Sequence, residues 1–90
     1  MLEAGRVVWS LGGHDKGRLY LVVRVAEDGC YIADGKRRPL GNPKRKNPRH
    51  LLATHLEIPP HHLTSDRALR RRLAQLSQET GPAPTREESC

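Results

Sequence analysis

The segment from Arg18 to Val25 constrains the fold more than any other part of the chain, because its apolar and polar residues alternate with a period of two. In an extended conformation one face is wholly apolar and consists of Leu19, Leu21, Val23 and Val25. The other face carries Arg18, Tyr20, Val22 and Arg24. Since successive side chains of a β-strand point to opposite faces, this pattern predicts a half-buried strand, with Tyr20 on its more open side.

Turn signals on both sides of this segment predict an antiparallel arrangement of short strands. Asp28-Gly29 favours a tight hairpin because both residues tolerate positive φ, so residues 30–34 are expected to return as the next strand. Residues 6–9 precede a glycine-rich turn over 10–17 and are expected to form the first strand. A last strand is predicted over 50–58, with one face formed by Leu52, Thr54, Leu56 and Ile58. Short strands at this spacing favour a small β-barrel over an open sheet.

The C-terminal part changes from a strand period to a helix period. Leu69, Leu73 and Leu76 recur at helical spacing after a capping residue, which predicts one amphipathic helix over 65–78. The leucines must dock on the barrel or on a partner, and we expect the barrel, because three exposed leucines would be a liability. The chain is therefore predicted to be mainly β, with a barrel over 1–60, a helical segment over 61–80 and a disordered tail over 81–90.

A proline-rich and strongly basic segment lies between two of the predicted strands. Proline lacks the N–H that a central strand needs, so residues 35–49 are expected to form a semi-rigid loop, with room for a short edge strand. No acidic residue occurs from Gly35 to Leu56, whereas seven cations fall there: Lys36, Arg37, Arg38, Lys44, Arg45, Lys46 and Arg49. The whole chain carries a formal charge of +6. A solvated loop is the alternative, but uncompensated cations favour a polyanionic partner.

Other candidate sites are fewer. The glycine-rich turn serves as a tight strand connection, and its backbone amides with His14, Lys16 and Arg18 are also candidates for phosphate or ribose contacts. Trp9 and Tyr20 are candidates for base stacking. Trp9 is nevertheless expected in the core, because the chain has no Phe, whereas both alternatives stay open for Tyr20. The histidines have neither helical spacing nor a second nearby cysteine ligand, so we expect no metal and no cofactor. Neither a nucleophile–base pair nor a phosphate-binding loop occurs, and the chain is not expected to be an enzyme.

Two stretches of the sequence resemble a known family. Gly5-Arg6-Val7-Val8, Gly13-His14-Asp15-Lys16-Gly17 and Leu21-Val22-Val23 resemble the KOW motif, a strand–loop–strand unit of ribosomal proteins and transcription elongation factors. Lys44-Arg45-Lys46-Asn47, His50-Leu51 and Thr54 resemble the large-subunit ribosomal protein family of the fourteen-e type, and so does Tyr20 in place of a commoner KOW glycine. The resemblance covers about residues 5–55. It implies an SH3-like barrel that binds RNA and has no catalytic residues.

These observations predict a non-enzymatic, basic RNA-binding protein that acts near the ribosome. The expected RNA, chosen over DNA chiefly on the resemblance, is ribosomal, and ribosomal proteins are further expected partners. The alternative is an SH3-like protein-interaction module that docks through its C-terminal helix; a membrane-surface role ranks third. The N-terminus has no signal-peptide pattern and cysteine usage favours reducing surroundings, so the chain is expected in the cytoplasm. It is also expected to be a monomer when isolated.

Overall fold

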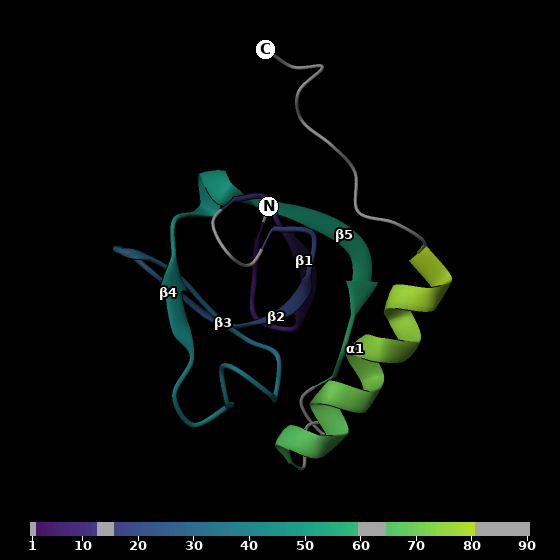
Figure 1. The fold of residues 1–90 in the computed structure, drawn as a ribbon. Coiled ribbons are helices and arrows are strands. Elements are labelled where there is room, and N and C mark those ends of the chain that lie inside the picture. Colours follow the sequence, from purple (N-terminus) through teal and green to yellow (C-terminus); the bar gives the residue numbers. More distant parts are fainter. Residues whose placement is uncertain (1, 13–15, 60–64, 81–90) are drawn as a thin grey trace.

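The computed structural model describes residues 2–12, 16–59 and 65–80 as a curved antiparallel sheet covered on one face by a helix (Figure 1). The chain runs through β1 (Arg6–Ser10), β2 (Leu19–Ala26), β3 (Gly29–Ala33), β4 (Lys44–Lys46), the 3-10 turn η2 (Pro48–His50), β5 (Leu51–Glu57) and α1 (Asp66–Thr80). The strand order in the sheet is β4-β3-β2-β1-β5. The strands and the helix predicted from the sequence are thus confirmed. The predicted tail over 81–90 lies outside the described residues.

The sheet has an apolar cluster on each face. The cluster on the face that α1 covers, here called the helix-side core, contains Val7, Trp9, Leu19, Leu21, Ala33, Ile58, Leu69, Leu73 and Leu76. The cluster on the opposite face, the second core, contains Val8, Tyr20, Val22, Cys30, Ile32 and Leu51. Trp9 is a core residue, as predicted, with 6% of its surface exposed. Burial also raises the pKa of the Cys30 thiol, because desolvation disfavours the thiolate.

The prediction that Tyr20 lies on the more open side of its strand is wrong. Tyr20 and Val22 are both 0% exposed, because the second core covers the face of β2 that α1 does not. Val25, predicted on the buried face, is 49% exposed. Its pairing follows a register shift between Val22 and Arg24, which interrupts the alternation of β2.

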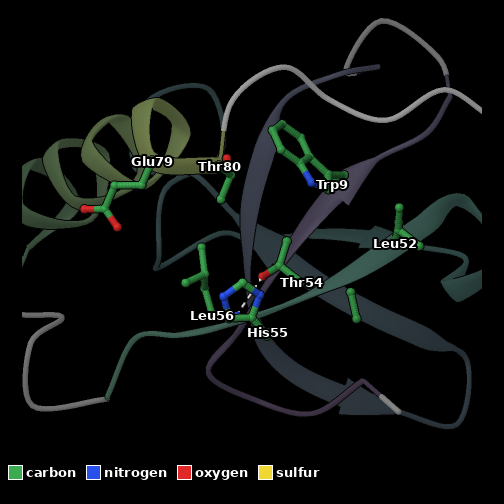
Figure 2. Close-up of a pocket in the computed structure, with 8 residues that line it drawn as sticks. Trp9, Leu52, Thr54, His55, Leu56, Glu79 and Thr80 are labelled. Carbon is green, nitrogen blue, oxygen red and sulfur yellow. Dashed lines mark hydrogen bonds between the residues drawn. The ribbon is translucent and has the colours of Figure 1, made fainter.

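The face predicted for the last strand is only partly correct. Ile58 is buried and Leu56 packs against the helix-side core, but Leu52 is 41% exposed. The residue that is buried at the start of β5 is its neighbour Leu51, which belongs to the second core. Leu52 instead lines a hollow beside the last residues of α1 (Figure 2), so the helix does not cover it.

The helix begins with a serine cap and packs its leucines on the sheet. The Ser65 hydroxyl accepts a hydrogen bond from the Ala68 backbone N–H at 3.1 Å, which satisfies one of the free donors of the first turn. Leu69, Leu73 and Leu76 are all buried in the helix-side core. The prediction that these leucines dock on the sheet is confirmed. No helix in the described ranges is long and apolar enough to span a membrane.

The connection from β3 to β4 is tied to the start of α1. The Leu40 backbone N–H donates to Asp66 Oδ1 at 2.6 Å. Asp34 Oδ1 accepts from the backbone N–H groups of Lys36 and Arg38, both at 2.9 Å. Gly35, with φ +79°, lies directly against the backbone of Asp66 and Arg70. These contacts fix the first part of the basic segment relative to the helix.

Replacing Gly35 by Ala should therefore destabilise the fold by about 1–3 kcal/mol or more, from left-handed backbone strain alone. The added Cβ would also meet the Asp66 carbonyl oxygen, which belongs to rigid backbone. Gly41→Ala is the matched control, because a Cβ there meets nothing within 4 Å and φ is not positive. Urea unfolding of both variants measures the difference. Equal midpoints would show that the connection does not pack on α1 as described.

Candidate nucleic-acid interface

The structure divides the predicted basic loop into three parts. Lys36, Arg37 and Arg38 follow β3 in a turn that Asp34 closes through its carboxylate and backbone. Lys44–Lys46 form β4, an edge strand of the sheet, and Arg49 lies in η2. Residues 44–46 thus form the short edge strand for which the sequence left room within the predicted loop. Pro43 and Pro48 lie just outside β4, so neither interrupts its pairing with β3.

The three cations of β4 lie on two faces of the sheet. Lys44 pairs with Ile32 and Lys46 with Cys30, so these half-buried lysines lie on the face of the second core. Their aliphatic stems can cover apolar surface while the charged ends reach water. Lys46 Nζ donates to the Gly12 carbonyl oxygen at 3.5 Å. Arg45 lies on the opposite face, is exposed, and donates from Nη1 to the Asp28 carbonyl oxygen at 2.9 Å.

Arg45 belongs to a row of basic and aromatic residues that the sequence analysis did not identify. Tyr31 pairs with Arg24 on β2 and with Arg45 on β4, so the three side chains lie beside one another across the sheet. The Arg24 guanidinium lies over the Tyr31 ring, with Cζ 3.7 Å from the ring centroid. The Tyr31 hydroxyl donates to Asp28 Oδ2 at 3.0 Å. Stacked aromatic rings and guanidinium planes are the groups on which unpaired RNA bases stack.

The aromatic residues considered from the sequence are not available for such stacking. Trp9 and Tyr20 are both buried in the two cores. Tyr31 is the remaining aromatic residue of the chain, and it is half-buried. The sequence contains a signal for Tyr31, because it directly follows Cys30 in the predicted return strand. Neighbouring residues of a strand face opposite sides, so if Cys30 faces a core, Tyr31 faces the other side of the sheet.

The glycine-rich turn lies beside the second half of the basic segment, and three of its backbone amides donate within the chain. The Leu11 N–H donates to the His50 carbonyl oxygen at 2.8 Å, and Lys46 reaches Gly12. The amides of Ser10 and Gly17 also donate to backbone carbonyls, at 2.9 and 2.8 Å. These three amides are thus already used within the chain and cannot also bind phosphate. Lys16 and Arg18 are exposed, and His14 lies outside the described residues.

The predicted site residues that the structure describes therefore do not all lie on one surface. Lys46 is brought to the glycine-rich turn, and Arg49 follows it in η2. Arg18 and Lys36 instead line one hollow with Arg70 of α1, a residue that the sequence analysis did not include. In Figure 1, β4 and α1 lie on opposite sides of the molecule, with the β3–β4 connection between them.

A further hollow of about 480 Å³ lies between β5 and the end of α1 (Figure 2). Trp9, Leu52 and Leu56 contribute its apolar lining, with His55 and Glu79 at its rim. The Thr54 hydroxyl is engaged with the backbone, since it donates to the Val7 carbonyl oxygen at 2.7 Å and accepts from the Leu56 N–H at 3.0 Å. Within the described ranges no three His, Cys, Asp or Glu side chains come together as metal ligands.

Comparison of the sequence with known protein families and with curated proteins gives no match in either case.

Proposed function

We propose that this chain is a non-enzymatic RNA-binding protein of the KOW type, with an SH3-like barrel fold, that binds ribosomal RNA in the cytoplasm. The observation that carries the proposal is the basic edge, which is strand β4 with Lys44, Arg45 and Lys46. This strand lies in a stretch of sequence without acidic residues, and its Arg45 belongs to the Arg24–Tyr31–Arg45 row. Cations along a strand supply phosphate contacts, and an aromatic–guanidinium stack suits unpaired bases. RNA is chosen over DNA because of the resemblance to the ribosomal family.

The arrangement of the resembling residues supports the same proposal. Residues 5–8 and 21–23 fall on or beside β1 and β2, two antiparallel strands joined by the glycine-rich turn. Lys44–Asn47 and His50-Leu51 fall on β4, η2 and the start of β5. Two antiparallel strands joined by a glycine-rich loop and followed by a basic run are the order of features that the resemblance would require, and this order supports the proposal.

The alternative of a protein-interaction module that docks through its helix has less support. That function needs Leu69, Leu73 and Leu76 to be free for a partner, whereas all three are buried in the helix-side core. Exposing them would cost the fold much of that core. The exposed face of α1 is instead rich in arginine, with Arg67, Arg70, Arg71 and Arg72.

RNA affinity should fall steeply as the salt concentration rises. If five of the seven cations in 36–49 contact phosphate, the slope of log K against log salt should be about −3 to −4, at roughly −0.7 per contact for a single strand. Fluorescence anisotropy of a labelled single-stranded RNA, titrated at several KCl concentrations, measures this slope. Weak binding with a slope near zero would oppose the proposal, because phosphate contacts would then not supply the affinity.

A further inference from the structure

A hollow of about 260 Å³ beside α1 gathers three cations from segments far apart in the sequence. Arg18 comes from the residue before β2, Lys36 from the turn after β3, and Arg70 from the second turn of the helix. Leu19 and Leu73, both buried in the helix-side core, contribute apolar lining, and Ser77 contributes a hydroxyl. The three cationic residues thus line one concave surface.

Among the described residues that line this hollow, positive charge exceeds negative charge. Asp34 is the acidic residue among them, and its Oδ1 already accepts two backbone hydrogen bonds. Within the described ranges, Arg18, Lys36 and Arg70 take part in no ion pair. Like charges brought together around a shared concavity repel one another, and an anion between them removes that repulsion.

The arrangement is held before any ligand arrives. Gly35 packs against the backbone of Asp66 and Arg70, and the Leu40 N–H donates to Asp66, so the turn that carries Lys36 is fixed against the helix. Leu73 anchors the same helix in the core one turn after Arg70. Backbone that is already fixed loses less conformational entropy on binding than a free loop does.

We propose that this hollow is a phosphate-binding site for the RNA backbone, in which α1 contributes Arg70 to an interface otherwise made by the sheet and its turns. The inference rests on the proposed function and adds to it a second region of RNA contact, distinct from the basic edge. Arginine suits the role because its planar guanidinium donates two parallel hydrogen bonds to phosphate oxygens. One RNA strand that contacts both regions would follow the β3–β4 connection, which runs between β4 and α1 in Figure 1.

Arg70→Gln and Arg71→Gln form a matched pair that tests the site. Both residues are exposed on α1 and both changes remove one charge, but Arg71 lies in a different hollow, with Ala68, Arg72 and Gln75. Each full-length variant is titrated with the same fluorescent single-stranded RNA over a KCl series. Arg70→Gln should bind about threefold more weakly or worse, with a slope shallower by about 0.7, because one phosphate contact is lost. Arg18→Gln should behave in the same way, and Arg71→Gln should resemble the parent.

Each other outcome has a distinct meaning. Equal affinity and slope for Arg70→Gln and Arg71→Gln, with normal binding by the parent, would overturn the phosphate site and leave the proposed function standing. Absence of RNA binding by the parent itself would overturn the proposed function and this inference with it. Urea unfolding of each variant confirms that a change in affinity does not come from loss of the fold.

Discussion

Replacing Leu21 by Ala should lower the free energy of unfolding by about 2–5 kcal/mol, which is a large part of the stability of a domain this small. Leu21 is 0% exposed and lies on β2, the central strand of the sheet, where it faces the helix-side core. Truncation removes its transfer free energy and leaves a cavity between the sheet and α1, which two rigid elements cannot easily close. Urea unfolding followed by circular dichroism measures the shift in midpoint.

Leu52→Ala is the control for this prediction, because it makes the same chemical change at a site that is 41% exposed. Its effect on the free energy of unfolding should stay within about 0.5 kcal/mol. Similar midpoints for Leu21→Ala and Leu52→Ala would contradict the assignment of β2 as the strand between the two cores.

The strands and the helix could be predicted because the sequence carries their periods directly. Alternation between Leu19 and Val23 indicates which residues share a face, and the spacing of Leu69, Leu73 and Leu76 indicates the buried stripe of α1. The alternation of apolar and polar residues does not indicate whether the second face of β2 is also buried. The alternation alone therefore places Tyr20 and Val22 toward solvent, whereas both are buried in the second core, which forms from residues of four strands.

The positive charge of the basic segment can be read directly from the sequence, but the path of its backbone could not be predicted. Three prolines favoured a loop, yet Pro43 and Pro48 lie outside the three paired residues of β4 and leave the strand free to form. The contact of Lys46 with Gly12 joins residues 34 positions apart, and local patterns contain no information on such a pairing.

The residues that were missed depend on register and on the position of the helix. Arg24, Tyr31 and Arg45 become neighbours because of the pairing of β2 with β3 and of β3 with β4, including the register shift in β2. Arg70 joins Arg18 and Lys36 because its side of α1 faces the turns after β3 and before β2. From the sequence, Arg70 was one of four helix arginines with nothing to distinguish it.

The central claim, that the basic edge binds RNA, predicts a large effect for the combined change of Lys44, Arg45 and Lys46 to Gln. Three phosphate contacts should be lost, so the log–log salt slope should become shallower by about two. Glutamine is chosen because it removes the charge but keeps part of the aliphatic stem that covers the second core beside Lys44 and Lys46. The fold should therefore survive, as urea unfolding will test.

The matched control removes the same number of charges from the outer face of α1, through Arg67, Arg71 and Arg72 to Gln. Both triple variants have the same net charge, so a general electrostatic effect would change their RNA binding equally.

The most direct measurement is the salt slope of RNA binding for the parent and for these two folded variants. The account predicts a slope of about −3 to −4 for the parent and the helix variant, and about −1 to −2 for the β4 variant. A β4 variant that is folded and keeps the parent's slope would contradict the assignment of the basic edge as the RNA site.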